Sequence, residues 1–549
     1  MKKYFNSLMK SVLVVSAVLV LASCNDTWDD HYSYKTDGNS SVMTLAETIS
    51  SLPGTSKFVD ALKTTYMYNE DKQLPMTYWE LLDGDQFFTV WVPDESQIPQ
   101  AIWDLAQVDV NERDHKKVGR EFLMNHIARF RHPVGSKTKE KVIMMSDKSY
   151  RSYSDNFGGI PYKAGANTTN IRCSNGIIHI LNGYVDYRPS IYEFITTNEA
   201  YRDVVGKWFE SYTEEVIDPK KSVAAGVNAD GEMEYVDSVL IKTSILMDKY
   251  GLVNEEDSNY TVVFPTPELW AQKYEAIKPY FEYGTIEAKR DSLQDFYTQS
   301  AMLTDMFFNM NIQKGDSVVS TLFSKAERKT EKIPYHVYQK PNAPGGLFAA
   351  RIDSVNCSNG VVYIRNTWPY EDNLTYLRPI KVEAEDVRLS GFETNPYNIY
   401  VYDQYDNRTD YHVMKIHKDQ LGWTAKYMIA DNLKGKYNLK LVVFRNMTDG
   451  RPNELHTSVY YYENTTANVL LDPQEYDPDW DDYYNHIDYT TGALFDTIVI
   501  GDVVFPTCNY KSNTPRVEVW IENTVSDFDS EFYAQDLWLD CIILDPVIE

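Results

Sequence analysis

The densest group of side chains that could do chemistry lies in the segment 472–488, DPQEYDPDWDDYYNHID. Calcium prefers clustered carboxylate oxygens, and four aspartates occupy the first, third, fifth and twelfth positions of an EF-hand-like loop. Asp482 stands at the sixth position, where that loop needs glycine, and no helical pattern flanks the segment. Calcium is therefore one interpretation of this segment. Its ligands would be Asp477, Asp479, Asp481 and Asp488.

The same segment carries the aromatic side chains Trp480, Tyr483 and Tyr484. Aromatic rings combine a flat apolar face with a polar handle, which suits contact with the apolar C–H face of a sugar ring. A loop that contacts a glycan or a protein is therefore a second interpretation. An ordinary solvated loop is the third, and the sequence leaves all three open.

A second aromatic site is predicted on the alternating stretch 516–522, RVEVWIE. Successive side chains of a strand point to opposite faces, so the valines and the isoleucine share one face, which should be core. The other face would place a tryptophan beside carboxylates and a guanidinium, an arrangement suited to stacking on and hydrogen bonding to a sugar. The alternative is that another loop covers the tryptophan. The predicted ligand-binding residues are Arg516, Glu518, Trp520 and Glu522.

Catalytic and metal motifs are not found. His126, His132 and His179 lack an HExxH pattern or another ligand spacing, so structural roles are expected for them. The sequence also lacks a nucleophile elbow, a P-loop and a dinucleotide-binding glycine pattern. A glycosidase pair is set by distance in three dimensions and leaves no spacing to find. We therefore expect no catalytic residue and no cofactor other than the calcium alternative.

The part of the chain that precedes these candidate sites contains an internal repeat. Cys-Ser-Asn-Gly occurs at 173–176 and again at 357–360, and each Asn-Gly turn leads into an apolar strand. Asn125-His126 aligns with Asn309-Met310 at the same spacing. Similar strands ending in proline, 88–93 and 260–265, precede both copies. We predict two diverged copies of one domain.

These motifs give the repeat a resemblance to a known family. FFTVWVPDESQI, LMNHIARF and CSNGIIHILNGYV of the first copy resemble the fasciclin (FAS1) domain. The second copy is weaker, because Met310 and Tyr363 stand where the first has His126 and His179. The resemblance implies two compact α+β domains, at 44–189 and 190–379, of a family associated with adhesion and ligand contact without shared catalysis. Fold alone does not fix function.

Strand patterns dominate the remaining residues, 380–549. Stretches 436–444, 516–522 and 537–547 read as strands, which predicts an all-β sandwich. The opening VEAED and the closing LWLDCIILDPV resemble the end strands of galactose-binding-like jelly rolls, including carbohydrate-binding modules. The predicted fold class is α+β, with two tandem FAS1-like domains followed by a jelly-roll-like sandwich.

The first residues predict export. Basic residues precede the apolar stretch 11–22, which is too short for a membrane span of about 20 residues, so 1–23 is expected to be a signal peptide. Leu-Ala-Ser-Cys, ending at Cys24, matches the bacterial lipobox, which implies lipidation of Cys24; an ordinary secretory signal is the alternative. The acidic tether, 24–43, resembles the surface-export signal of Bacteroidetes lipoproteins, and a plain solvated linker is its alternative. Together they imply a lipid-anchored protein on the outer membrane, facing the exterior.

Composition narrows the partners. The formal net charge of −27 and the pI of about 4.8 argue against nucleic acid, which requires basic patches. Four cysteines besides Cys24 do not form a disulfide framework, and buried small residues are expected. The 42 tyrosines and 11 tryptophans suit glycan contact, although core packing accounts for most of them.

Three functions follow in order of preference. The first is a cell-surface lipoprotein that binds a polysaccharide or oligosaccharide with its C-terminal domain, as an accessory to an outer-membrane importer and with its lipid as the only membrane contact. The second is an adhesin that binds a protein or matrix partner through the FAS1 repeats. The third is a cryptic hydrolase, which turnover of a glycan would reveal.

Overall fold

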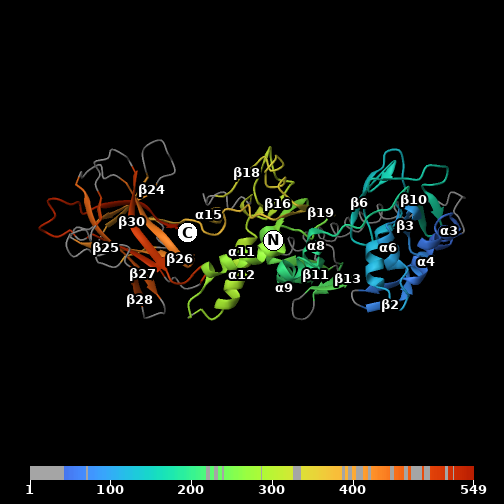
Figure 1. Cartoon of the computed structure of the whole chain (residues 1–549), viewed down its shortest axis with the longest axis horizontal. Coiled ribbons are helices and arrows are strands. Elements are labelled where there is room, and N and C mark those ends of the chain that lie inside the picture. Colours follow the sequence, from blue (N-terminus) through green and yellow to red (C-terminus); the bar gives the residue numbers. More distant parts are fainter. Residues whose placement is uncertain are drawn as a thin grey trace, which may run out of the picture. The chain divides into compact units, whose positions relative to one another are not determined.

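The computed structural model describes residues 43–548 with gaps. The undescribed internal residues are 70–71, 218–222, 228–232, 238–239, 286, 325–334, 386–389, 393–397, 404–411, 418–421, 445–450, 463–467, 472–484, 488–494, 513–516 and 524. Cys24, the expected signal peptide and nearly all of the tether lie outside the described residues. Two compact units divide the chain, Met1–Arg188 and Pro189–Glu549 (Figure 1). No helix among the described residues is long and apolar enough to cross a membrane.

The first unit packs short helices against one mixed sheet, with α4 and α6 beside β3 and β10 in Figure 1. The sheet order is β4-β3-β10-β9, and β3 and β10 are parallel. A second sheet has the order β5-β6-β7-β8, and its strands lie in the sequence between β4 and β9 of the first sheet. The elements are α3 Leu45–Ser51, α4 Ser56–Thr64, β1 Tyr66–Asn69, β2 Lys72–Thr77, α5 Tyr78–Asp83, β3 Phe88–Val92, η1 Glu95–Gln97, α6 Gln100–Ala106, α7 His115–Val118, η2 Gly119–Leu123, η3 Met124–His126, β4 Ile127–Arg129, β5 Lys139–Ile143, β6 Ser149–Tyr153, β7 Asn156–Phe157, β8 Ile160–Pro161, β9 Ile171–Cys173 and β10 Gly176–Ile180.

The Asn-Gly turn of the first unit ties the sheet to its first helix. Asn175 accepts a hydrogen bond from the Leu45 N–H at 2.8 Å and donates to the carbonyls of Leu82 and Gly84 at 2.8 and 2.6 Å. A Cβ at Gly176 would lie 2.1 Å from the Phe88 carbonyl oxygen, so the close approach of β10 to β3 requires glycine there. The motif therefore joins three elements that are distant in sequence.

The second unit repeats this arrangement at its beginning. Its mixed sheet has the order β16-β15-β20-β19, with β15 and β20 parallel. Asn359 accepts from the Ile191 N–H at 2.9 Å and donates to the carbonyls of Val253 and Glu255. The elements are α8 Ile191–Thr197, η4 Arg202–Gly206, α9 Lys207–Ser211, β11 Thr213–Ile217, β12 Val223–Val227, β13 Met233–Asp237, β14 Leu240–Ser244, α10 Ile245–Tyr250, β15 Tyr260–Pro265, α11 Pro267–Ile277, η5 Lys278–Phe281, α12 Arg290–Met302, β16 Phe307–Asn309, β17 Ser317–Val318, α13 Thr321–Ser324, β18 Tyr338–Gln339, β19 Asp353–Cys357, β20 Gly360–Arg365 and α15 Asp372–Thr375.

The helix that opens each repeat begins with the same device. Thr44 accepts from the Glu47 N–H while Glu47 accepts from the Thr44 N–H, and Ser190 and Glu193 do likewise. Such a capping box satisfies two of the free N–H groups at a helix start. This first helix ends at Ser51, and Gly54, at φ 77°, lies between it and α4.

Strand register corrects one sequence alignment. Val90 pairs with Ile127 in the first repeat, and the equivalent Val262 pairs with Phe307 in the second. Asn125 and His126 therefore correspond to Asp305 and Met306, four positions before the residues that sequence spacing selected. Asp305 is 1% exposed and accepts a hydrogen bond from the Tyr338 hydroxyl at 2.8 Å, and burial raises its pKa. The second repeat thus has a buried acid where the first has a buried amide.

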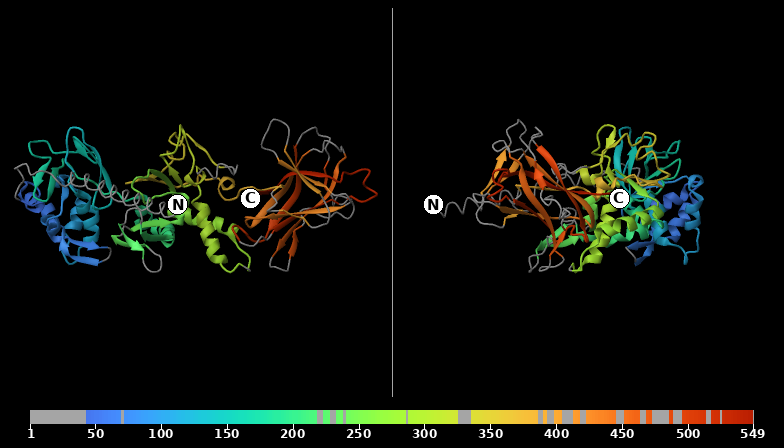
Figure 2. Two further views of the ribbon diagram at one scale, coloured as in Figure 1. Left: turned by 180° about the vertical axis from the view of Figure 1, so that it is seen from behind. Right: turned by 60° about the vertical axis from the view of Figure 1, so that its left-hand side comes forward.

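The residues from Ile380 onward form a β-sandwich of two antiparallel sheets, in orange and red in Figure 2. The first sandwich sheet has the order β23-β24-β32-β26-β30, with β21 also on β32, and the second has β22-β25-β31-β27-β28, with β29 also on β27. Side chains from both sheets form one apolar core. The strands are β21 Ile380–Glu383, β22 Ser390–Phe392, β23 Asn398–Asp403, β24 His412–His417, β25 Trp423–Ile429, β26 Gly435–Phe444, β27 Asn453–Tyr462, β28 Asn468–Leu471, β29 Asn485–Ile487, β30 Phe495–Phe505, β31 Val517–Asn523 and β32 Leu537–Pro546.

Within the second unit, the sandwich is bonded to the repeat that precedes it. The Cys508 N–H donates to the Glu282 carbonyl at 2.7 Å, and the Lys434 N–H donates to the Tyr280 carbonyl at 2.9 Å. The Tyr283 hydroxyl donates to the Tyr510 carbonyl at 2.7 Å. Backbone bonds of this kind fix the segment around Tyr280 against the end of the sandwich.

The four described cysteines are all buried and none forms a disulfide; they are Cys173, Cys357, Cys508 and Cys541. Cys173 and Cys357 each end the strand before an Asn-Gly turn. Burial raises the pKa of the Cys173 and Cys508 thiols. They therefore act as small apolar core residues in this fold.

The turn motif predicts a specific loss of stability. Asn175→Ala would leave one N–H and two carbonyl groups without a partner in a buried site, which should lower the free energy of unfolding of the first unit by about 3 kcal/mol. Urea denaturation of the full chain measures this loss. Asn111→Ala, in an exposed loop, is the control. A loss no larger than that of the control would contradict the role assigned to Asn175.

The buried histidines predict acid lability of the first unit. Burial lowers the pKa of both His126 and His179 to about 4. Unfolded histidine titrates near 6.5, so the stability that these residues contribute is complete above about pH 6.5 and is lost as pH falls toward 4. Each histidine should cost up to about 3 kcal/mol at the acid end of this window.

Hydrogen exchange read by mass spectrometry, at pH 7 and pH 4.5, follows the two units separately. Protection should fall further in the first unit than in the second, where Met306 and Tyr363 stand at these positions. His126→Met should remove part of the difference. Equal losses in both units would show that other groups control the acid response.

Candidate functional site

Strand β31 has the alternation that the sequence predicts. Val517, Val519 and Ile521 are 0% exposed and belong to the sandwich core. Glu518, Trp520 and Glu522 are half-buried on the opposite side of the strand. They therefore lie on the outer face of the second sandwich sheet.

Pairing with the two neighbouring strands builds a patch around these three residues. Trp520 lies between Lys426 of β25 and Ser458 of β27. Glu518 lies between Met428 and Tyr460, and Glu522 between Thr424 and His456. Directly opposed side chains of neighbouring strands are in contact range. We call this patch the aromatic face; it consists of Thr424, Lys426, Met428, His456, Ser458, Tyr460, Tyr462, Glu518, Trp520 and Glu522.

Trp520 is the centre of the aromatic face. Its ring centroid lies 4.2 Å from that of Tyr460, with the planes inclined by 44°. The Lys426 ammonium nitrogen lies 3.4 Å from the centroid of the Trp520 ring, a close cation–π contact. Among the described residues, the Tyr460 ring and the Lys426 side chain thus both lie against the Trp520 ring.

The two glutamates are held by hydrogen bonds. Glu518 accepts from the Trp520 indole N–H at 2.9 Å and from the Tyr462 hydroxyl at 2.8 Å. Glu522 contacts His456 Nδ1 at 3.3 Å and accepts from the Thr424 hydroxyl at 3.3 Å. The hydrogen bond from His456 is the main reason that the pKa of Glu522 is lowered. Hydrogen bonds therefore orient both carboxylates before any ligand arrives.

A serine, a histidine and a glutamate meet on this face, but their geometry is not that of a hydrolase triad. The Ser458 hydroxyl and the Glu522 carboxylate both contact the same ring nitrogen of His456, Nδ1, at 3.3 Å. A triad needs the acid on one ring nitrogen and the nucleophile on the other. Ser458 is also 1% exposed, so a substrate carbonyl would not reach it without rearrangement.

The outer face of the first sandwich sheet has a different character. Lys440 pairs with Asp545 at 2.6 Å and Lys436 pairs with Asp502 at 2.6 Å. Asn438 also donates to Asp502. Besides these surface ion pairs, the buried side chains of Phe444 and Trp538 form an aromatic pair apart from the sandwich core, with ring centroids 6.0 Å apart.

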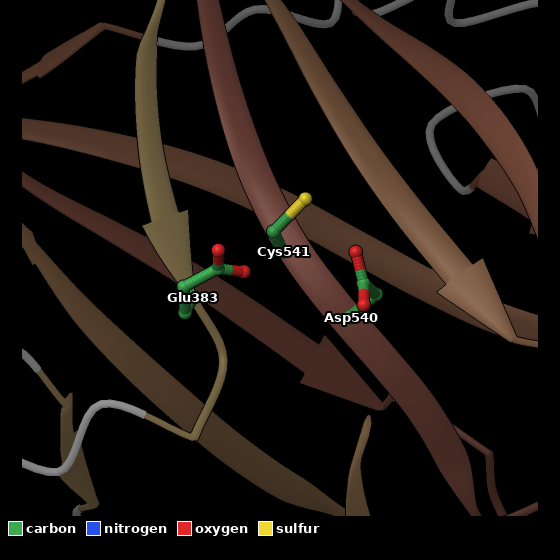
Figure 3. A group of neighbouring side chains, drawn as sticks. All are labelled: Glu383, Asp540 and Cys541. Atoms are coloured by element: carbon green, nitrogen blue, oxygen red, sulfur yellow. The ribbon is translucent and has the colours of Figure 1, made fainter. Parts of the chain in front are cut away.

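One group of donors could hold a metal ion where β21 meets β32. Glu383, Asp540 and Cys541 place one donor atom each within 4.8 Å of one another (Figure 3). Lys381 neutralises Glu383 at 2.8 Å, and burial raises the pKa of Asp540. Two carboxylate oxygens suit a hard cation such as calcium, whereas burial raises the pKa of the Cys541 thiol, which therefore stays protonated.

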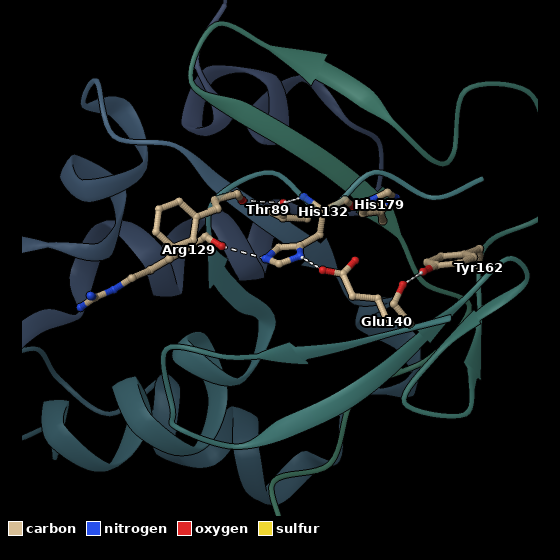
Figure 4. Close-up of polar contacts among 8 residues, drawn as sticks. Thr89, Arg129, His132, Glu140, Tyr162 and His179 are labelled. Atoms are coloured by element: carbon tan, nitrogen blue, oxygen red, sulfur yellow. Dashed lines mark hydrogen bonds and ion pairs between the residues drawn. The ribbon is translucent and has the colours of Figure 1, made fainter. Parts of the chain in front are cut away.

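The three histidines of the first unit do not converge on a metal. His132 lies between the Glu140 carboxylate, 2.8 Å from Nδ1, and the Arg129 carbonyl, 2.9 Å from Nε2 (Figure 4). His179 donates from Nε2 to the His132 carbonyl and accepts from the Asn170 N–H. His126 donates to the Phe122 carbonyl and accepts from the Val185 N–H. Every ring nitrogen already has a partner within the protein.

Several predicted site residues lie outside the described residues. Arg516 is one, and of segment 472–488 only β29 is described, paired with β27. Lys426, Tyr460 and Tyr462 were not among the predicted site residues. The alternation in β25 and β27 would have placed them, but only pairing shows which strands flank β31. The undescribed predicted residues are Arg516, Trp480, Tyr483, Tyr484, Asp477, Asp479, Asp481 and Asp488.

No protein-family model and no curated protein matches the chain. A Paenibacillus xanthan lyase is similar at 16% identity over 33% of this chain and 14% of the lyase, with a TM-score of 0.21. The CBM22-1 xylan-binding domain of Paenibacillus barcinonensis Xyn10C matches at 8% identity over 31% of this chain and 96% of the domain, with a TM-score of 0.21. A family 35 carbohydrate binding module from Clostridium thermocellum matches at 12% identity, over 31% and 99%, with a TM-score of 0.18. TM-scores this low carry no argument about the fold, so the sandwich is assigned from its strand order and its common core.

The carboxylates at β21 and β32 predict a response to calcium. If they hold the ion, 2 mM CaCl₂ should raise the thermal unfolding midpoint of the chelator-treated protein by a few degrees, because a ligand that binds only the folded state stabilises it. Asp540→Asn should abolish the rise, and Asp545→Asn, on the same strand, should not. An unchanged midpoint would mean that these carboxylates do not bind calcium and that Lys381 alone balances their charge.

Proposed function

We propose that the chain is a surface lipoprotein that captures extracellular glycan on the aromatic face of its C-terminal sandwich. The observation that carries the proposal is the arrangement of Trp520 and Tyr460 beside Glu518, Glu522 and Thr424. Rings with apolar faces bind the C–H side of a sugar, and oriented carboxylates accept hydrogen bonds from its hydroxyl groups.

The proposed action is capture without chemistry. Ser458 and Glu522 contact the same nitrogen of His456, which is not the arrangement that activates a serine nucleophile. Binding would instead hold a chain of sugar residues across three strands. An outer-membrane importer is the proposed recipient, and its identity would follow from the glycan.

The rest of the chain would present this face to the medium. The lipobox cysteine, Cys24, and the acidic tether after it support a lipid anchor on the cell exterior. The two repeats, proposed to be FAS1-like domains, would act as spacers between the membrane and the sandwich. Bonds between the second repeat and the sandwich, such as that of Cys508 to Glu282, would keep the face in a fixed relation to that repeat.

Affinity electrophoresis of the full chain on gels that contain a panel of polysaccharides tests the proposal. At least one polysaccharide should retard the protein, and Trp520→Ala should abolish the retardation, because the central ring on which the sugar stacks is lost. Trp79→Ala is the matched control, because Trp79 is also half-buried with a lysine, Lys63, 4.3 Å from its ring centroid. Retardation that survives Trp520→Ala would place the site elsewhere.

Adhesion through the first repeat is the second candidate. Phe130 is 61% exposed and has the positive φ of 69°, an uncommon backbone for a large residue, which suggests a functional constraint. Phe87 is 40% exposed, and the Arg131 guanidinium lies 4.0 Å from its ring centroid. If no polysaccharide retards the protein, binding to a protein matrix that Phe130→Ala abolishes would favour this function.

A further inference from the structure

The aromatic face already holds an ammonium group. Lys426 Nζ lies 3.4 Å from the centroid of the Trp520 ring, well within the range of about 6 Å for a cation–π contact. Lys426 stands directly opposite Trp520 in the register of β25 and β31. The contact is therefore built into the pairing of the two strands.

Two carboxylates bracket this position. Glu518 and Glu522 precede and follow Trp520 by two residues, so all three side chains project from the same face of β31. The charge of Lys426 is one of the causes that lower the pKa of Glu522. An aromatic ring between two carboxylates has the groups that bind a cation. Here the protein itself supplies the cation, which is the ammonium group of Lys426.

The charge balance determines which ligands can replace Lys426. A sugar that stacks on the face of Trp520 that Lys426 covers must move the ammonium group away from the ring. A neutral sugar would leave the two carboxylates without that cation, whereas a protonated amino group on the sugar would restore it. An anionic sugar would add a third negative charge to the site, and like charges at this range repel.

We propose that the aromatic face selects glycans that carry free, protonated amino groups, with Lys426 as the internal cation that such a ligand displaces. This inference rests on the proposed function and names its ligand class: a polymer of amino sugars that are not N-acetylated. Lys426 then sets specificity by charge, because it occupies the site whenever no better cation is present.

Isothermal titration of the full chain at pH 6 tests the inference with two hexamers. The probes are a β-1,4-linked glucosamine hexamer and its fully N-acetylated form, which share linkage and length and differ in charge. The amino hexamer should bind at least about tenfold more tightly at low salt, and the ratio should fall as salt screens the carboxylates. Trp520→Ala should abolish binding of both.

Variants of the charged residues isolate the effect. Glu518→Gln combined with Glu522→Gln should reduce the preference for the amino hexamer to about unity. Lys426→Ala should raise the affinity for the amino hexamer several-fold, because the internal competitor is gone. Lys440→Ala is the control, since it removes an equivalent charge from the other sandwich sheet, where Lys440 pairs with Asp545. Circular dichroism and the thermal midpoint check that each variant is folded.

The outcomes separate this inference from the function on which it rests. Equal affinity for both hexamers, lost in Trp520→Ala, would overturn the preference for amino sugars and leave glycan capture intact. Amino-hexamer binding that survives Trp520→Ala would reflect attraction to the net charge of −27 and would also overturn it. If neither hexamer nor any polysaccharide of the panel binds, the proposed function itself is wrong.

Discussion

Burial of the ridge formed by Val517, Val519 and Ile521 between the two sandwich sheets is the constraint on which the candidate site depends. The side-chain period of a strand is two, so a register slip of one residue would expose this ridge and bury Glu518, Trp520 and Glu522 instead. The apolar core forbids such a slip, because it would place two carboxylates among side chains that are fully buried. The position of the aromatic face is therefore a consequence of core packing, although none of its members contributes much to that core.

The same argument explains why the face is preorganised. Lys426, Trp520 and Ser458 lie in one row across three strands because backbone pairing holds them there. Hydrogen bonds then fix the glutamates, with Tyr462 and the Trp520 indole on Glu518 and His456 on Glu522. A ligand would meet groups whose orientation is already set, which lowers the entropic cost of binding.

The two repeats show how one backbone plan tolerates different buried polar groups. In both repeats the asparagine of the Asn-Gly turn accepts a hydrogen bond from the first backbone N–H of the opening helix. This residue is Asn175 in the first repeat and Asn359 in the second. Beyond that shared contact they diverge: the first buries His126 and Asn125, and the second has Met306 and the acid Asp305 at the same positions. Acid should therefore act on the two in opposite senses, since the histidines favour the folded state at higher pH and the acid favours it at lower pH.

Sequence alone determined what depends on local pattern. The Asn-Gly turns, the repeated strands and the alternation around Trp520 follow from backbone conformational preferences and from the period of a strand, and the structure has them in these places. Tertiary structure alone decided which residues meet across strands. Sequence spacing aligns Asn125 with Asn309, whereas strand register shows that Asp305 is the equivalent residue of the second repeat. Spacing fails here because the segments between strands can change in length without changing the sheet. Lys426 and Tyr460 joined Trp520 for the same reason: sequence spacing carries no information about which strands become neighbours, and only burial of a common core selects them.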